Sequence, residues 1–288
     1  MAQTCRLNMD EWPMLIVSLH GKSIPVREAD TAKSVWVGGQ ANQLSQLTVA
    51  QPLIDSIHFA TKQRGKGSGG ISLGEPAPIG SGEIKLPSPA FSTRSFGEVA
   101  RKRRSALDFL GGEHSISMAE LSDILAVTAQ TVSGDFADGH FIHLYMYAHR
   151  VDGLQPGVYR FWPSQNELEQ VKSGDQRLAA SDLSLGQNLA GNACVTFSMI
   201  GGLDRAAGVY GDRGYRYVYF EAGAIGHRLY LAAEALGLGA TGIGAFYDDE
   251  VHSYLNLTPR QGQAIYHFAI GFPVPDPRIS ASDKPQEI

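Results

Sequence analysis

A basic run from Arg101 to Ser105 carries the most evident chemistry in a chain whose net charge is −5. Guanidinium groups match phosphate oxygens in a bidentate geometry, so Arg103 and Arg104, with the hydroxyl of Ser105, are candidates for holding a phosphate group. Five consecutive helical residues cover more than one turn, so they cannot all face one ligand. The alternative is a solvated helix face, because runs of charge usually lie at the surface.

A glycine-rich stretch lies further along the chain, between Gly237 and Gly244. Its sequence GLGATG matches the dinucleotide-binding pattern G-x-G-x-x-G, but that pattern must follow a strand and open a helix. Here a long helical pattern precedes the glycines and a strand pattern follows them. The stretch is therefore predicted to be a helix C-cap at Gly237 or Gly239 and a turn. Glycine lets the backbone approach a planar ligand closely, so Gly242, Ile243 and Gly244 are candidates for that role.

Metal binding and nucleophilic catalysis find little support in the sequence. His140 and His143 stand three apart in a strand pattern and point to opposite faces. His143 and His149 share a face but are separated by about 20 Å, so no metal site is predicted. Cys194 precedes an apolar strand and is expected to be a buried, inert thiol.

The composition excludes several classes of protein. The chain has 288 residues, of which 43% are hydrophobic, and this is enough to bury a sizeable core. A net charge of −5 gives no general basic field for nucleic acid or anionic lipid. The most apolar long run, Val218 to Leu238, contains Glu221 and Arg228 and is not expected to cross a bilayer. With two cysteines and no signal-peptide pattern, the chain is expected to be cytoplasmic.

Three parts are expected along the chain. Residues 1–64 form an N-terminal segment, with a strand predicted over residues 34–39 and a helix over residues 49–62. Residues 65–90 are rich in Gly, Ser and Pro, a composition that is typical of a linker. Residues 91–288 are expected to form one compact domain.

The compact domain intermixes helix and strand patterns. Capping boxes at Ser95 and Ser117 predict helices over about 96–109 and 118–130. Further helices are predicted over residues 182–193 and 215–236, after a cap at Asp248 or Asp249, and from Thr258. Strands are predicted over residues 140–150, 153–162, 193–202, 241–246 and 264–273, the first two as a hairpin. Without a regular βαβ period, this order predicts an α+β fold.

Six segments follow one another in a specific order between Leu86 and Arg278. They are LPSP, RRSALDF, ELSDIL, RVDGLQPGVYRF, the long run from YGDRGYRY to HSYLNL, and YHFAIGFPVPDPR. This series resembles the nitroreductase-like flavoprotein superfamily, and within it the branch of SagB-type (azoline) dehydrogenases and their tandem-domain relatives. The resemblance implies an α+β fold, a mixed sheet flanked by helices, that binds FMN at the interface of a homodimer. It also implies hydride transfer through the flavin, with NADH or NADPH as an electron donor.

The resemblance assigns roles to the basic run. Arg103, Arg104 and Ser105 match the family motif that contacts the FMN phosphate and ribityl chain. The later basic position of that motif is Leu107 here, so one contact to the flavin is lost. Arg278 matches a basic residue near the carboxyl end that also meets the phosphate.

The resemblance also indicates where the flavin ring and the acid–base chemistry would lie. The strand from Gly242 to Gly244 matches the one whose backbone amides lie beside the flavin N5 edge, and Ser133 belongs to a degraded copy of the family's P-S-G-G segment. The azoline dehydrogenases carry a Lys-Tyr pair before R-G-Y-R, where this chain has Val209 and Tyr210. Tyr210 is then the remaining candidate for acid–base catalysis, and azoline oxidation is not expected.

Two functions follow from the resemblance. The first is an FMN-dependent oxidoreductase of the nitroreductase type, which Arg103 and Gly244 favour. The second is a degenerate, non-catalytic subunit that serves as a scaffold or partner in a biosynthetic complex, which Leu107 and Val209 favour. Residues 37–62 resemble the junction after a first nitroreductase-like copy in tandem proteins. That first copy would then be a separate partner chain or lost.

Overall fold

The structure is a computed structural model that describes residues 49–62, 82–132 and 140–277. The strand expected over residues 34–39, most of the expected linker, and the candidates Ser133 and Arg278 lie outside the described residues. The chain divides into two compact units, residues 1–58 and 59–288. The helix expected over residues 49–62 is confirmed as α1 (Pro52–Thr61), which spans the division.

A seven-stranded sheet forms the centre of the second unit, in the order β1-β6-β5-β3-β7-β9-β8. All of its neighbouring strands pair antiparallel. In chain order its strands are β1 (Ile84–Lys85), β3 (Ile142–Ala148), β5 (Gly157–Trp162), β6 (Glu167–Ser173), β7 (Val195–Gly201), β8 (Gly239–Ile243) and β9 (Gln263–Gly271). Two short strands, β2 (Ile116–Ser117) and β4 (Val151–Asp152), pair in parallel beside it.

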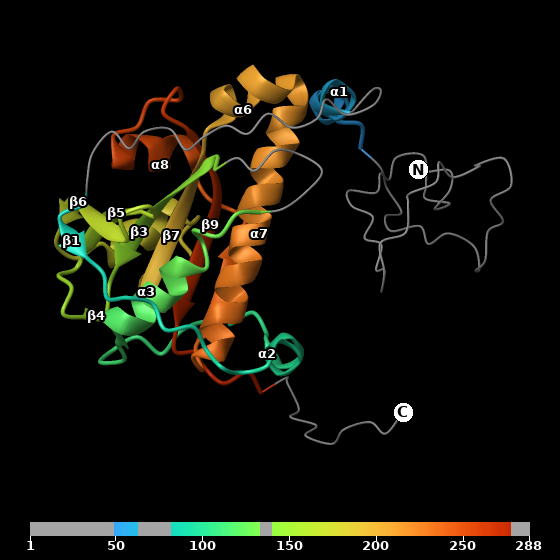
Figure 1. Cartoon of the computed structure of the whole chain (residues 1–288). Coiled ribbons are helices and arrows are strands. Elements are labelled where there is room, and N and C mark those ends of the chain that lie inside the picture. The colour runs from blue at the N-terminus through green and yellow to red at the C-terminus, as the bar shows by residue number, and fades with distance from the viewer. Residues whose placement is uncertain (1–48, 63–81, 133–139, 278–288) are drawn as a thin grey trace, which may run out of the picture. The chain divides into compact units, whose positions relative to one another are not determined.

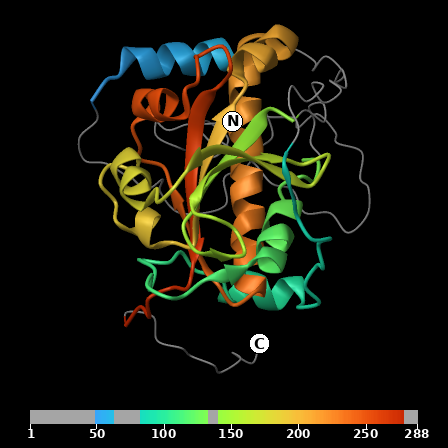
Figure 2. The same ribbon diagram turned by 90° about the vertical axis from the view of Figure 1, so that its left-hand side faces the viewer.

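Helices cover both faces of the sheet (Figures 1 and 2). One face packs against α7 (Gly214–Ala235), α3 (Met118–Ala126) and α6 (Leu203–Tyr210), whose apolar residues share one core with the sheet. The other face packs against α4 (Arg177–Leu183), α5 (Leu189–Asn192) and α8 (Asp248–Leu255). The helix α2 (Phe96–Lys102) lies near the C-terminal end of α7, and a short 3-10 helix, Gly211–Arg213, joins α6 to α7. The α+β fold with flanking helices is confirmed.

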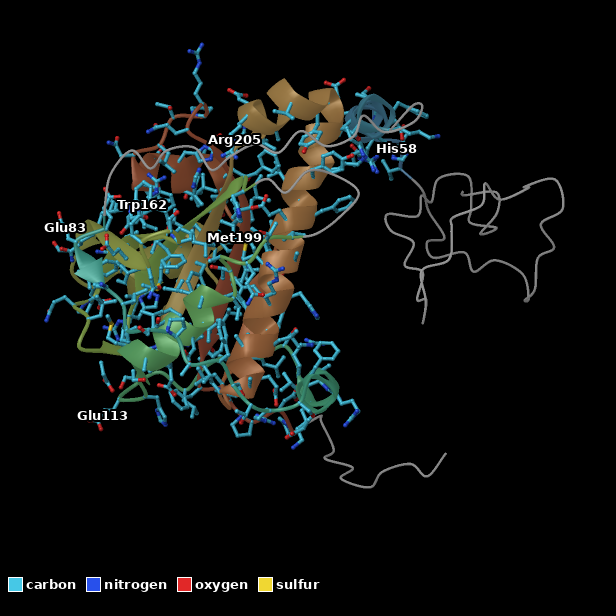
Figure 3. All side chains as sticks on the ribbon, in the orientation of Figure 1. His58, Glu83, Glu113, Trp162, Met199 and Arg205 are labelled. Atoms are coloured by element: carbon cyan, nitrogen blue, oxygen red, sulfur yellow. The ribbon has the colours of Figure 1, made fainter. Side chains whose placement is uncertain are left out.

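The alternation expected for β3 is also confirmed. Leu144 and Met146 lie in the core beneath α7, whereas Tyr145 and Tyr147 lie in the core on the opposite face. β3 pairs with β5 as the expected hairpin and with the fully buried β7, whose Met199 lies inside the molecule in Figure 3. The side chains of one strand thus tie both helical layers to the sheet.

The helix expected over residues 96–109 is wrong beyond Lys102. Ser95 caps α2 as predicted, with its side chain accepting from the amide of Glu98, but Arg103 leaves the helix at φ −49°, ψ 129°. The chain then runs extended, so that Ser105 forms a parallel bridge with Ala240. Pairing with a distant strand has overridden the local helical pattern.

Other boundaries differ for local reasons. β8 begins two residues earlier than expected, and the helix expected over residues 182–193 is divided into α4 and α5 because Leu185 and Gly186 have positive φ values of 57° and 69°. The N-cap of α8 is Tyr247, without a side-chain cap, so the predicted aspartate cap is wrong. Thr258 begins a turn and not a helix. Helix α6 and strands β1, β2, β4 and β6 were not expected, and β1 lies within residues 65–90, which were predicted to be a linker. The C-cap of α7 is Leu236, and the predicted glycine, Gly237, follows it with φ 77°.

No helix in the described ranges is long and apolar enough to cross a membrane.

Candidate functional site

The basic run and the glycine-rich strand, which are far apart in the sequence, meet along the outer edge of β8. Ser105 bridges to Ala240 of β8, and the amide of Ala106 donates to the Ala240 carbonyl at 2.9 Å. The hydroxyl of Thr241 donates in turn to the carbonyl of Ala106. The extended chain that follows α2 therefore lies along β8, on the side away from β9. This places the basic run beside the glycine-rich strand.

Tyr230 of α7 joins the two motifs. Its phenol oxygen accepts a hydrogen bond from the amide of Gly242 at 2.8 Å and lies 2.9 Å from Oγ of Ser105. Its ring lies edge-on to Phe268 of β9, and the guanidinium carbon of Arg103 lies 5.0 Å from the ring centroid. Because an amide can only donate, the phenol proton can be donated to Ser105. The hydroxyl proton of Ser105, which is exposed, can then point to an oxygen of a ligand.

The guanidinium groups here have no carboxylate partner among the described residues. Glu98 of α2 pairs with Arg94 at 2.8 Å and with Lys102 at 3.5 Å, but not with Arg103 or Arg104. Arg104 donates to the backbone carbonyls of Arg101 and Arg103 at 2.9 and 2.8 Å. The site thus combines uncompensated positive charge with a hydroxyl donor, a donor set that fits a phosphate group.

The two glycines of β8 and its end differ in their surroundings. A Cβ atom at Gly242 would lie 1.7 Å from the hydroxyl oxygen of Tyr266, so packing requires glycine there. A Cβ atom at Gly244 would meet no heavy atom within 4 Å, and Gly244 is exposed. Since the amide of Gly242 already binds Tyr230, Gly244 is the glycine whose backbone is open to a planar ligand. A cofactor that joins a phosphate to a planar ring would thus find donor groups at the basic run and exposed glycine backbone at the end of the strand paired with it.

Tyr210, the predicted catalytic residue, lies apart from this cluster. It ends α6, and its ring contacts those of Phe141 and Tyr217, with centroid distances of 6.2 and 4.9 Å. Tyr217 precedes Tyr230 by thirteen residues on α7, which corresponds to about 20 Å along the helix. The structure therefore brings together Arg103, Ser105 and Gly242 at Tyr230, whereas Tyr210 contacts Tyr217 near the other end of α7.

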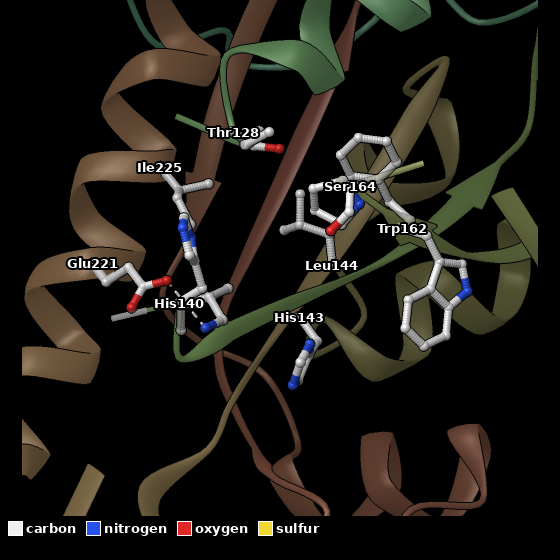
Figure 4. Close-up of a pocket in the computed structure, with 12 residues that line it drawn as sticks. Thr128, His140, His143, Leu144, Trp162, Ser164, Glu221 and Ile225 are labelled. Carbon is white, nitrogen blue, oxygen red and sulfur yellow. Dashed lines mark hydrogen bonds between the residues drawn. The ribbon is translucent and has the colours of Figure 1, made fainter. Parts of the chain in front are cut away.

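A cavity of about 60 Å³ lies where β3 begins (Figure 4). Glu221 of α7 lines it, and burial raises the pKa of this carboxyl to about 7. Its two oxygens accept from the amide of Phe141 at 3.0 and 2.9 Å, and one also accepts from Ile142 at 3.2 Å. Burial lowers the pKa of His143, also in the cavity, to about 4. Glu221 thus serves as an anchor for β3, because its acceptor oxygens are already occupied.

A larger cavity, of about 300 Å³, lies between α2, α3 and α7 and is lined mainly by apolar side chains such as Phe91, Val127 and Leu231. Within the described ranges, no three His, Cys, Asp or Glu side chains gather as a metal site would need. Cys194 is buried, and burial raises the pKa of its thiol, as expected of an inert residue.

Sequence reasoning missed Tyr230 and Glu221. Both stand on the long helix, where Tyr230 follows Gly226 by one turn and Glu221 interrupts an apolar run. Glu221 was readable as a charge that a buried helix must satisfy. Tyr230 carried no such signal, because its role depends on contacts to Ser105 and Gly242 that arise only in the folded chain.

Comparisons with known proteins identify the family of the chain. A sequence model of the Nitroreductase family matches residues 100–272. A protein of Methanocaldococcus jannaschii, provisionally named a nitroreductase, is 30% identical over 183 residues, which cover 61% of this chain and 90% of that protein. The trifolitoxin operon protein TfxC of Rhizobium leguminosarum bv. trifolii is 28% identical over 117 residues, 40% of this chain and 33% of that protein.

Among solved structures, a protein of Anabaena variabilis, provisionally named a nitroreductase, matches with a TM-score of 0.66 and 27% identity. The match covers 84% of this chain and 51% of the Anabaena chain. This chain therefore spans about half the length of that protein.

Proposed function

The chain belongs to the nitroreductase family, and on this premise we propose that it is an FMN-dependent oxidoreductase. It transfers hydride between the flavin and either NADH or NADPH, or a small organic substrate. The observation that carries the proposal is the meeting of Arg103, Ser105 and Gly242 at Tyr230, with no carboxylate partner for the guanidinium groups in the part of the chain that the structure describes.

The residues of the β8 edge would divide the work of holding FMN. Arg103 and Arg104 would bind the phosphate, and Ser105 would donate to the phosphate or the ribityl chain. The backbone from Gly242 to Gly244 would face the ring, Gly244 most openly. Arg278 and Ser133, which lie outside the described residues, remain proposed contacts to the same cofactor. FMN would supply the redox chemistry, and the protein its position and electrostatic surroundings.

The substrate we propose is an easily reduced acceptor, such as a quinone or a nitroarene. A base removing a carbon-bound proton is worth about 10²–10⁴-fold in rate, and a phenol with an ordinary pKa near 10 is a poor base at neutral pH. Tyr210 is the proposed acid–base residue, and Val209 stands where the azoline dehydrogenases have lysine. We therefore expect weak reductase activity and negligible azoline oxidation.

We also propose that the protein acts as a cytoplasmic homodimer. Gly244 at the end of β8 is exposed, and Leu107 and Leu110, which follow the segment paired along β8, are exposed at 50% and 48%, which fits a site completed by a second subunit. A partner chain carrying a first nitroreductase-like copy is the other arrangement.

A second candidate is a non-catalytic subunit of a biosynthetic complex. Two observations favour it: Leu107 lacks the charge of the family motif, and a relative is named as a trifolitoxin operon protein. In this case the protein would bind its partner chain and leave hydride transfer to another subunit.

One set of assays separates the two functions. FMN-loaded protein is supplied with NADH or NADPH and a nitroarene or a quinone, and a peptide azoline is tested as the alternative substrate. Acceptor reduction above that of free FMN supports the oxidoreductase, and Tyr210→Phe should lower it if Tyr210 delivers a proton. No reduction of any acceptor by FMN-loaded protein would support the scaffold. Strong azoline oxidation that persists in Tyr210→Phe would contradict the proposed role of Val209 and Tyr210.

A further inference from the structure

The segment that follows β8, Gly244 to Tyr247, is held from behind at three points. The side-chain amide of Gln187 donates to the carbonyl of Ala245 at 3.2 Å, and the amide of Tyr247 donates to the carbonyl of Leu183 at 3.0 Å. Between them the ring of Phe246 stacks on the imidazole of His267, with centroids 4.5 Å apart and planes at 10°. Gly244 and Ala245 are exposed. One side of this short segment is therefore fixed by packing and hydrogen bonds, and the other side is exposed to solvent.

The imidazole of His267 is itself fixed at both nitrogens. Nδ1 lies 3.1 Å from the hydroxyl of Ser184, at the end of α4, and Nε2 lies 3.0 Å from the hydroxyl of Ser198 on β7. Ser198 donates its proton to the hydroxyl of Tyr147 at 3.2 Å. Nε2 must then donate to Ser198, and Nδ1 accepts from Ser184. Burial lowers the pKa of His267 to about 4, so the ring stays neutral and keeps this single tautomer at physiological pH.

Another buried histidine, His149, provides a contrast. Its Nε2 contacts the carbonyl of Ala190 at 3.1 Å, and burial also lowers its pKa to about 4. It lies beyond the end of β3, which is separated from β8 by the two strands β7 and β9. Its burial resembles that of His267, but it supports no residue of the candidate site. A buried histidine with a lowered pKa therefore does not by itself support the candidate site. His267 differs from His149 because it stacks on Phe246.

We propose that His267 and Phe246 are positioning residues that hold the backbone of Gly244 and Ala245 in place beside the redox edge of the flavin. The inference rests on the proposed FMN site and deepens it. A functional group works only when it is held within about 0.5 Å of its productive position, and groups on loops need support from packed neighbours. Here the support comes from α4, β7 and β9, on the side of the segment that a ligand would not reach.

Phe246 offers a matched set of substitutions. Phe246→Leu removes the stacking face but leaves the hydrogen bonds of His267 intact, whereas Phe246→Tyr keeps an aromatic face. His267→Gln removes the ring beneath Phe246. His149→Gln is the control, because it changes a histidine of similar burial that does not touch the segment.

Two measurements test the proposal. The first is hydrogen exchange of the amides of residues 245–247 in protein without flavin. The second is the midpoint potential of bound FMN. In Phe246→Leu and His267→Gln we expect exchange at least tenfold faster, and at least a threefold lower ratio of reduced to oxidised flavin at a fixed potential. The Kd for FMN should stay within threefold, because the Arg103 cluster is unchanged. In Phe246→Tyr both the exchange rate and the midpoint potential should stay at their wild-type values, and in His149→Gln neither should change.

The outcomes distinguish the positioning role of His267 and Phe246 from the proposed FMN site on which it rests. If wild-type protein binds no FMN, the proposed function fails and the positioning role falls with it. If FMN binds but Phe246→Leu leaves the exchange or the potential like that of His149→Gln, only the positioning role of His267 and Phe246 is overturned.

Discussion

The edge of β8 and the cavity at the start of β3 both contain ionisable side chains but differ in what those side chains have left to bind. In the cavity, Glu221 has a pKa raised to about 7 and sits beside His143, features that often mark a functional site. Yet both of its oxygens are bound to backbone amides. At the β8 edge, Arg103 and Arg104 have no carboxylate partner among the described residues, and Ser105 is exposed.

We therefore choose the candidate site by unused capacity for hydrogen bonds and charge pairing, and not by concavity or a shifted pKa. A buried carboxyl with its acceptors satisfied stabilises the fold. Positive charge without a counter-charge, close to exposed backbone, instead favours the binding of an anionic ligand. Substitutions at Glu221 should therefore change stability, whereas substitutions at the β8 edge should change FMN binding.

The largest effect is expected from Glu221→Ala. The amides of Phe141 and Ile142 lose their acceptor, and each buried unsatisfied amide costs about 1–3 kcal/mol, so the free energy of unfolding should fall by roughly 2–5 kcal/mol. Urea unfolding measures this loss, with the exposed Glu250→Ala as control. If Glu221→Ala unfolded like Glu250→Ala, the anchor role of Glu221 would be wrong.

The pH dependence of stability should show the same carboxyl. The pKa of Glu221 is raised from 4.5 to about 7 in the folded chain, so the folded state binds the extra proton more tightly than the unfolded state between these values. The contribution of Glu221 is therefore complete below about pH 4.5, is lost as the pH rises to about 7, and is then constant; the loss amounts to about 3 kcal/mol at most. Unfolding of Glu221→Gln across this range should lack that component. Identical profiles for the two proteins would show that Glu221 titrates normally.

At the β8 edge, Arg103→Ala should weaken FMN binding by about ten- to a hundredfold. A charge-assisted hydrogen bond to phosphate contributes roughly 1.5–3 kcal/mol, and Arg103 has no carboxylate partner within the described chain whose loss would alter stability. Calorimetric titration with FMN measures the change, and Arg177→Ala, which breaks an exposed ion pair with Asp175, is the matched control. Equal affinities of the two variants for FMN would mean that Arg103 is a solvated surface residue that does not bind the cofactor.

The smallest effect is expected from Tyr230→Phe, which removes only the hydroxyl between Ser105 and Gly242. A neutral hydrogen bond is worth about 1 kcal/mol, so FMN affinity should fall about fivefold, with a loss of stability of similar size. Titration and urea unfolding of the same sample give both values. A normal affinity with reduced stability would mean that Tyr230 only packs the fold.

The fold was largely predictable because its strongest patterns are local. The long helix α7, the alternation of β3, the N-cap at Ser95 and the capping box at Ser117 all follow from neighbouring residues. The end of α2 was not predictable in this way, since Arg103 leaves the helix to let Ser105 pair with Ala240.

The candidate site was predictable only in part. The resemblance to a family pointed to Arg103, Ser105 and Gly242 separately, and the structure shows that they meet. Tyr230, which connects them, and His267, which supports the segment after β8, act through contacts between distant parts of the chain. No local pattern encodes such contacts, so their roles emerge only from the folded arrangement.

The flavin content of the purified protein tests the central claim most directly. The protein is purified without added cofactor, titrated to saturation with FMN and measured by its visible spectrum before and after denaturation. We expect the purified protein to be yellow, to bind one FMN per subunit and to release the FMN intact on denaturation. A colourless protein that takes up no added FMN, even at high concentration, would contradict the assignment of the β8 edge as a flavin site.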